Sequence, residues 1–308
     1  MDAVTGRVLW SYDVKQDGNQ SSFHGNPLLI SDLVIVGADH GTDIQGQGHI
    51  YAFNRATGAV QWKYLAAPGI SSDLLTDAPR IVALAQTGEL IGLEIHSGQS
   101  VWKQRATDPG RDRYLPSPAL LHHVVYTGGF LGSLTAVDAR TGKLVWQRRL
   151  QPDGRVQPVI AGGAVYAITD THIYKIGPIA NHVARGASLD SAPSFQPVGT
   201  ANSIILEFQD HTVRSLSAGE KVEMQWSHKA AAALTTHGPF IVGSDVVVAD
   251  ETNLITAVRL SDGALHWSFK LTDVKDPITV IASDHENLYV GTQGGTLSAI
   301  KLKHLADR

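Results

Sequence analysis

Short stretches of alternating apolar and polar residues, the pattern typical of half-buried β-strands, recur along the whole chain. One clear example is Leu134–Asp138, which is followed after a turn containing Gly142 by the apolar stretch Lys143–Trp146. Leu144 and Trp146 fall on the same face of this second stretch, because successive strand residues point to opposite faces. The pattern predicts a β-hairpin whose return strand ends in a tryptophan.

The tryptophans mark an internal repeat. The six are Trp10, Trp62, Trp102, Trp146, Trp226 and Trp267. They are separated by 52, 40, 44, 80 and 41 residues, so the gap of 80 predicts one degenerate copy near residue 186. The period of about 43 residues lies in the range of propeller repeats. A large ring once per repeat suits the gap between neighbouring sheets, where it buries ~150–250 Å². We therefore predict a packing role for all six.

The residues before each tryptophan share one turn. Residues 2–10 align without a gap to residues 138–146, and both copies contain Thr-Gly. An Asp or Asn that ends the first strand can accept backbone N–H bonds, and glycine supplies the positive φ of a tight hairpin. The copy ending at Trp226 has Gly219 three residues early, which predicts an insertion. The copy Ile173–Pro178 has lost both the turn and the tryptophan.

Two further strand signals precede each hairpin, for example Ser117–Leu121 and Val124–Gly128. Four short strands per repeat and no convincing helix predict an all-β fold, a seven-bladed β-propeller of four-stranded blades. We expect one domain over residues 1–308. The chain opens at Thr5–Trp10 as a fourth strand and ends at Thr296–Leu302 as a third strand. Pairing of these two would close one blade and remove exposed sheet edges.

The unit Leu134–Asp138, Thr141-Gly142-Lys143 and Trp146 resembles the PQQ-like β-propeller repeat of quinoprotein alcohol dehydrogenases and of BamB-like proteins. The repeat also occurs in sensor domains of some bacterial kinases. The resemblance covers nearly the whole chain and implies the fold, but propellers host unrelated activities. It also implies a location outside the cytoplasm.

The dehydrogenases of this family hold PQQ with calcium, use an aspartate base and often carry a disulfide of adjacent cysteines. They usually have eight blades. This chain has no cysteine, and all its tryptophans occupy repeat positions. We therefore expect no PQQ or calcium and no cofactor of another kind.

Composition narrows the function further. The chain has 308 residues, a hydrophobic fraction of 43% and a net charge of -4. Without cysteine it has no disulfides, thiolate nucleophile or Cys-type metal site. The charge and the lack of a basic run argue against nucleic acid as a partner. No apolar run reaches the ~18–20 residues of a membrane-spanning helix. The first residues lack the features of a signal peptide.

No common catalytic motif occurs in the sequence. A glycine-rich loop over residues 37–49 contains four metal-ligand residue types, namely Asp39, His40, Asp43 and His49. Such a loop could bind a metal. The alternative is a long solvated hairpin rich in turn-forming residues.

Polar residues recur just before or at the predicted first strands, which in a propeller surround the mouth of the central channel. The set is His24, Asn26, Ser72, Asp73, Ser117, Gln157, Ser191, His237 and Asp276. They form a candidate binding surface, or they simply satisfy backbone groups at strand starts. The charged loop over residues 105–114 adds a candidate partner site at Arg111, Arg113 and Tyr114, since arginine and tyrosine are enriched in binding hot spots.

We interpret the chain as a non-enzymatic scaffold that binds a protein partner. Two alternatives remain: a ligand-sensing propeller of a longer signalling protein, with a small molecule bound at the channel mouth, and a PQQ-dependent oxidoreductase.

Overall fold

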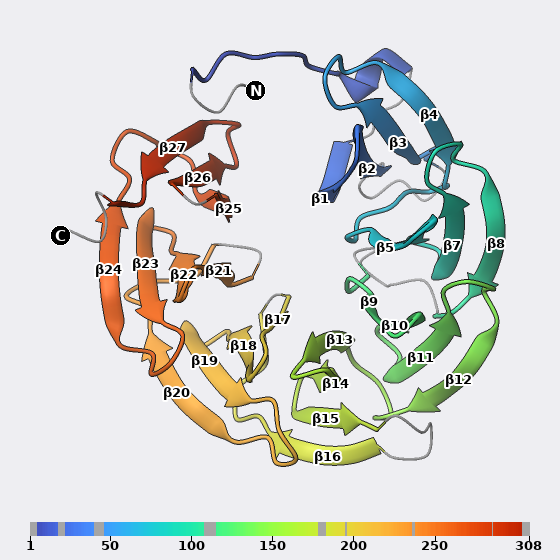
Figure 1. Ribbon diagram of the computed structural model, residues 1–308. Coiled ribbons are helices and arrows are strands. Elements are labelled where there is room, and N and C mark those ends of the chain that lie inside the picture. Colours follow the sequence, from blue (N-terminus) through green and yellow to red (C-terminus); the bar gives the residue numbers. More distant parts are fainter. Residues whose placement is uncertain are drawn as a thin grey trace. The chain divides into compact units, whose positions relative to one another are not determined.

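The computed structural model describes residues 5–17, 22–39, 46–107, 115–177, 183–194, 196–235, 238–284 and 286–303. Within these residues the chain forms 27 β-strands and one short 3-10 segment, η1 (Val14–Asp17) (Figure 1). The chain divides into two compact units, residues 1–158 (unit one) and residues 159–308 (unit two). The boundary lies inside strand β13, and we describe each unit by itself.

Unit one contains three four-stranded antiparallel sheets, which we call blades 1 to 3. Blade 1 consists of β1 (Ser22–Ile30), β2 (Leu33–Asp39), β3 (His49–Asn54) and β4 (Val60–Leu65). Blade 2 consists of β5 (Leu75–Asp77), β6 (Arg80–Leu84), β7 (Glu89–Glu94) and β8 (Ser100–Arg105). Blade 3 consists of β9 (Ala119–Leu121), β10 (Val124–Gly128), β11 (Ser133–Asp138) and β12 (Leu144–Arg149).

Unit two continues with blades 4 to 7, of which blade 4 begins on β13 at the boundary. Blade 4 consists of β13 (Val156–Ala161), β14 (Ala164–Thr169), β15 (His172–Ile176) and β16 (Val183–Ser188). Blade 5 consists of β17 (Val198–Gly199), β18 (Ser203–Glu207), β19 (Thr212–Ser217) and β20 (Met224–Lys229). Blade 6 consists of β21 (Phe240–Val242), β22 (Asp245–Ala249), β23 (Leu254–Arg259) and β24 (Leu265–Lys270). Blade 7 consists of β25 (Ile278–Ser283), β26 (Asn287–Thr292) and β27 (Leu297–Lys301).

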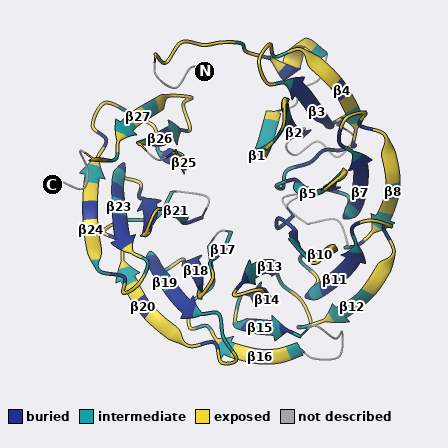
Figure 2. Ribbon diagram, in the orientation of Figure 1, coloured by how far each residue is buried: buried dark blue, intermediate teal, exposed yellow. Residues whose placement is uncertain are grey.

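The seven sheets confirm the predicted fold class, an all-β seven-bladed propeller. Within each blade the strands pair in chain order, so the fold follows directly from the hairpins that the sequence repeats. The middle strands carry the core, as Figure 2 shows for β7, β11, β19 and β23, whereas the fourth strands are largely exposed. The apolar face of each middle strand meets the neighbouring blade of its unit, as in the cluster that joins Ile50 and Ala52 to Ile81 and Ile91.

The predicted closure of the propeller stays a prediction. Blade 7 has three strands among the described residues, and residues 6–13 form no strand. The segment that was predicted as a fourth strand is nevertheless held on blade 1. The Trp10 indole N–H donates to the Arg55 carbonyl over 2.9 Å, and the Tyr12 ring lies 4.8 Å from that of Phe53. That the whole chain forms one domain likewise stays a prediction.

Each of the five tryptophans that lie on a fourth strand faces a small residue on the third strand of its own blade. The pairs are Ala52 with Trp62, Gly92 with Trp102, Ala136 with Trp146, Ser215 with Trp226, and Ala257 with Trp267. In all five blades the register shifts immediately after this pair, which is the mark of a β-bulge. At Gly92 an added Cβ would lie 2.3 Å from the Trp102 ring. The residue opposite the tryptophan must therefore be small, so that the indole can lie flat over the third strand of its own blade.

Four of the six indoles contact the turn glycine of the blade that follows them in the chain. The Trp62 ring lies over Gly98, and its N–H donates to the Ile95 carbonyl over 2.9 Å. Trp10, Trp102 and Trp226 repeat this contact with Gly58, Gly142 and Gly263, and each donates to the carbonyl three residues before that glycine. These four contacts are the ones that the predicted packing role requires. The Trp267 N–H instead donates to the Asp245 carboxylate over 3.1 Å.

The degenerate copy lies where the spacing predicts it. Residue 186 is a glycine on β16, at the place where the repeat expects a tryptophan. A Cβ on Gly186 would lie 2.9 Å from the side chain of Val222, which comes from the irregular turn between β19 and β20. The valine of one irregular repeat therefore packs where the indole of the other is missing.

We expect Gly98→Ala to lower the free energy of unfolding by roughly 2–4 kcal/mol. Gly98 has a φ of 67°, which strains an L-residue, and its new methyl group would lie 2.5 Å from the Trp62 ring. Gly163→Ala is the matched control, because Gly163 has a φ of 71° but no atom within 4 Å of the new methyl. The control should lose only about 1 kcal/mol in chemical denaturation. Equal losses in the two variants would contradict the docking role of this turn.

Candidate functional site

Three residues at the predicted channel mouth form a hydrogen-bonded chain across the blades of unit one. The Asn26 backbone N–H donates to the Asp73 carboxylate over 2.7 Å, and the Asn26 amide contacts both oxygens of that group. The Asp73 backbone N–H in turn donates to the Ser117 hydroxyl over 3.1 Å. These bonds link the middle of β1 in blade 1 to the residues just before β5 in blade 2 and β9 in blade 3. Among the predicted positions, Asn26 stays exposed and Asp73 half-buried.

A bulge in β1 shapes this contact. The pairing of β1 with β2 shifts between His24 and Leu28, and Gly25 inside the bulge has a φ of 72°. A Cβ at Gly25 would lie 2.8 Å from the Ser72 carbonyl oxygen, so only glycine lets the two backbones approach this closely. The bulge places Asn26 against Asp73.

His24 forms the second polar contact of this surface. Its Nδ1 bonds to the carboxylate of Asp39, the last residue of β2. The Asp39 side chain is fully buried, whereas the imidazole is 35% exposed. The hydrogen bond from Asp39 raises the pKa of His24, and burial of the ring opposes that shift only in part. The pair is therefore a protonatable group on β1, two residues before Asn26.

The remaining predicted residues of unit one serve the fold. Ser72 is buried, and its hydroxyl donates to the Leu84 carbonyl over 3.4 Å. Ser117 and Gln157 are also buried. Ser72 and Ser117 each bond to a backbone group, as expected if these polar residues satisfy the backbone at strand starts. We use the term strand-start surface for the three that remain accessible, His24, Asn26 and Asp73.

In unit two the predicted residues are not brought into one network. Ser191 is half-buried, and Asp276 is exposed, with its carboxylate against Gly294. His237 lies outside the described residues.

Sequence reasoning missed the polar residues that hold the strand starts of unit two. The Asn253 side chain accepts the Ile278 N–H over 3.1 Å, and the Thr235 hydroxyl donates to the Ile278 carbonyl over 2.7 Å. Asn253 has a φ of 61°, a conformation that asparagine tolerates better than most residues. In the sequence, Asn253 belongs to the polar stretch Asp250–Asn253, which is typical of a turn and does not indicate a contact with the next blade.

Arg214 is a second missed residue. Its guanidinium bonds to the carboxylates of Asp190 and Asp210 and lies 4.2 Å from the centre of the Phe208 ring. The residue therefore joins the start of blade 5 to its central turn.

The proposed metal loop is only partly described. Asp39 bonds to His24, and the buried His49 ring lies 5.7 Å from that of Tyr51, whereas His40 and Asp43 lie outside the described residues. The part of the chain that the structure describes contains no group of three potential metal ligands. Metal binding by this loop stays a prediction. Arg111, Arg113 and Tyr114 also lie outside the described residues.

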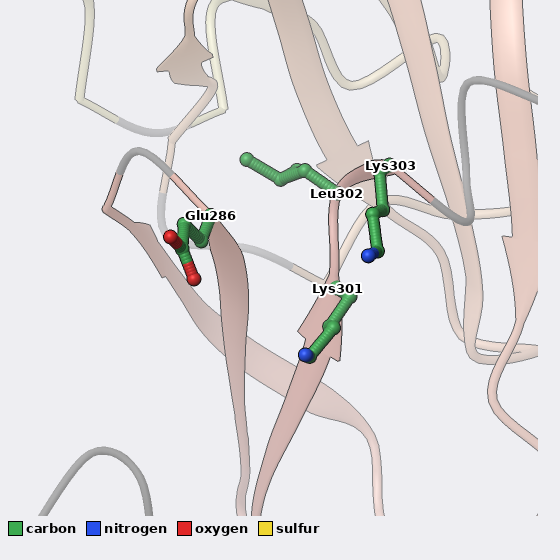
Figure 3. A pocket seen from close by; sticks show the side chains of 4 residues that line it. All are labelled: Glu286, Lys301, Leu302 and Lys303. Atoms are coloured by element: carbon green, nitrogen blue, oxygen red, sulfur yellow. The ribbon is translucent and has the colours of Figure 1, made fainter.

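A small pocket of about 240 Å³ lies elsewhere, on blade 7. Glu286 lines it from the turn between β25 and β26, and Lys301, Leu302 and Lys303 line it from the end of β27 (Figure 3). None of the predicted site residues lines it. In the described ranges, no helix has the length and apolar character required to cross a membrane.

Comparison with known proteins places the repeat in context. The family model described as outer membrane protein assembly factor BamB matches residues 1–218. The BamB proteins of Yersinia pestis and Nitrosomonas eutropha are each 23% identical, over 87% and 86% of this chain. The chain spans 68% and 64% of their lengths. The crystal structure of BamB from Moraxella catarrhalis matches with a TM-score of 0.73 and 20% identity, over 97% of this chain and 87% of that one. This likeness shows the fold.

Quinoprotein dehydrogenases match less of the chain. The quinohemoprotein alcohol dehydrogenase ADH IIB of Pseudomonas putida is 27% identical, over 49% of this chain and 23% of its own length. The predicted resemblance to both groups is confirmed.

We expect His24 to titrate above its ordinary pKa of 6.5 in an NMR titration, and Asp39→Asn to lower the midpoint. A raised folded-state pKa means that the pair stabilises the fold fully below pH ~6.5 and that this contribution is lost as pH rises through the folded pKa. His228 is the internal control, because burial lowers its pKa and it should titrate below 6.5. A His24 midpoint that does not respond to Asp39→Asn would contradict the pairing.

Proposed function

This chain belongs to the family of the outer membrane protein assembly factor BamB, and from that membership we propose that it acts as a non-enzymatic scaffold in outer membrane protein assembly. The proposal rests on how much of this chain, and how much of each relative, the matches cover. The BamB relatives match most of this chain, whereas the dehydrogenase matches half of it and less than a quarter of its own length. The dehydrogenase likeness therefore extends to the repeat and not to a whole enzyme.

We propose that the chain does not bind PQQ, and the contacts of four indoles support this proposal. A planar quinone needs a flat aromatic platform, and the repeat uses its indoles elsewhere. The N–H groups of Trp62, Trp102 and Trp226 bond to turns of neighbouring blades, and that of Trp267 bonds to Asp245. We derive no redox step for this chain and propose that it takes no quinone cofactor.

The scaffold would bind its protein partner through the side of unit one that carries the strand-start surface. Asn26 and Asp73 supply polar groups on adjacent blades, and His24 adds a group whose charge depends on pH. The charged loop with Arg111, Arg113 and Tyr114 connects blade 2 to blade 3, whose first strands begin beside Asp73 and Ser117. Asn26 and Asp73 would supply hydrogen bonds to the partner, and arginine and tyrosine are the residue types enriched in binding hot spots.

The family also supports a place for the chain in the cell envelope, outside the cytoplasm. A small-molecule ligand at the strand-start surface stays a prediction, and with it the alternative of a ligand-sensing propeller.

Replacing Arg111, Arg113 and Tyr114 together by alanine should abolish capture of outer membrane assembly proteins from envelope extracts, as measured by affinity purification and mass spectrometry. The temperature of thermal unfolding should not change. Arg259→Ala with Lys270→Ala on blade 6 is the control pair and should leave capture intact. Unaltered capture by the triple variant would refute the partner loop.

Titration of the chain with PQQ and calcium tests the enzymatic alternative. We expect no change in the absorbance of the quinone and no dye reduction with alcohols, because the indoles are committed to blade packing. Stoichiometric binding followed by turnover would overturn the scaffold proposal.

A further inference from the structure

Strand β12 presents an open sheet edge in unit one. It is the terminal strand of blade 3, and among the described residues only β11 pairs with it. Leu144 and Val145 are 51% and 52% exposed, and Gln147 and Arg149 are exposed as well. An edge of this kind carries unpaired backbone donors and acceptors and can accept a further strand.

Basic residues gather on the outer parts of blades 1 to 3. We define these parts as the turn before each fourth strand together with that strand, residues 55–65, 95–105 and 139–149. They contain no aspartate or glutamate, although the whole chain has a net charge of -4. Their basic residues are Arg55, Lys63, Lys103, Arg105, Arg140, Lys143, Arg148 and Arg149. The corresponding parts of blades 5 and 6 mix both signs, with Glu220, Glu223 and Asp262 beside their lysines.

Blade 3 is the extreme case. Lys143, the residue just before β12, lies three residues before the tryptophan, and Arg149, the last residue of β12, lies three residues after it. Other fourth strands differ: the same two positions hold Glu223 and Lys229 in blade 5, and Ala264 and Lys270 in blade 6. Of the five described fourth strands with a tryptophan, β12 alone has a cation at both positions. The six-residue span corresponds to about 20 Å of extended chain.

Two of these cations are available at the surface. Lys143 and Arg149 are exposed, and the Arg149 guanidinium donates to the backbone carbonyls of Gln151 and Pro152. These acceptors orient the guanidinium without neutralising its charge. By contrast, Lys63 lies 3.5 Å from the Asp17 carboxylate and Lys103 lies 3.8 Å from that of Glu89.

We propose that the outer edge of β12 binds an extended polypeptide segment of a partner by strand addition. The segment has acidic residues at both ends of a six-residue span and apolar or β-branched residues between them. Its backbone pairs with β12, its carboxylates meet Lys143 and Arg149, and the apolar side chains next to the carboxylate on Lys143 lie beside Leu144 and Val145. Cations at both ends of β12 repel a second copy of the same edge, so the charge that prevents self-association selects an acidic strand.

This proposal deepens the scaffold function, and its test does not depend on capture of assembly proteins. The probe is a capped, fluorescent eight-residue peptide with two glutamates at each end and alternating valine and threonine between them. Anisotropy should show saturable binding that weakens as salt is raised. The double variant Lys143→Glu and Arg149→Glu should bind at least tenfold more weakly. Hydrogen exchange should slow at the amides of β12 when the peptide binds, because strand addition occupies them.

The matched control changes the same two repeat positions on blade 6. Ala264→Glu with Lys270→Glu should leave peptide affinity within twofold of the unmodified chain. If the charge-reversed variant does not fold, Lys143→Gln with Arg149→Gln replaces it, and we expect a loss of at least threefold.

Four results would overturn the proposal. They are an absence of peptide binding, equal weakening by the blade 6 control, equal binding of a peptide with lysines in place of the glutamates, or binding without protection of β12 amides. Failure of the loop variant to affect capture would leave this result untouched, so the two proposals can fail separately. Sedimentation with vesicles of phosphatidylglycerol and phosphatidylethanolamine tests the other anionic surface, and vesicle binding through Lys143 and Arg149 without peptide binding would assign the edge to lipid.

Discussion

The contact of one indole with the turn glycine of the next blade is the interaction on which the rest of the structure depends. It joins two requirements that are local in sequence, a tryptophan on the return strand and a glycine in the hairpin. The indole buries its ring between blades and its N–H satisfies a turn carbonyl, as Trp62 does with Ile95. Such a bond contributes about 1 kcal/mol, and burial of the ring contributes more. Blade 2 shows both halves of the contact, because its turn receives Trp62 of blade 1 and its own Trp102 lies over the turn of blade 3.

The irregular repeats follow from the same constraint. The fourth strand of blade 4 has Gly186 in place of a tryptophan. The turn between β19 and β20 in blade 5 therefore has no indole to pack against. This turn is free to change, and Val222 packs into the space instead. The lost tryptophan and the displaced Gly219 were two separate anomalies in the sequence. In the structure the two changes are linked, because Val222 fills the space that the missing indole leaves, and a close-packed interior does not tolerate an empty space of that size.

The sequence could predict the features that depend on local geometry. Alternation identified the strands, Thr-Gly identified the hairpins, and the tryptophan spacing gave the blades and the degenerate copy. It could also have revealed the small residues opposite the indoles, since Ala52 and Ala136 each stand two positions before the polar residue that ends the strand.

The candidate site was predictable only as a set of positions. Asn26 and Asp73 are 47 residues apart, and their bond depends on a bulge in β1 that leaves no periodic signal. Ser72, Ser117 and Gln157 are also polar residues near predicted strand starts, yet they are buried and are not accessible to a partner. Asn253 lay in a turn and gave no hint that it would hold the start of the next blade, 25 residues away. Whether these polar residues bind a partner or hold the fold depends on contacts between blades. Residues far apart in the chain make those contacts, so local sequence patterns do not reveal them.

The repeat thus limits where function can reside. Positions that form the hairpin and its docking contact must keep their residue types, because a methyl group on the turn glycine would already collide with the indole. The residues three places before and after the tryptophan face no such demand. Evolution of binding is therefore least constrained at the strand starts and along the outer edges, which is where charge varies most between blades. A propeller of this type can gain a partner through substitutions at its surface while its packing contacts stay the same. Fold and function are therefore specified by separate sets of residues within one short repeat.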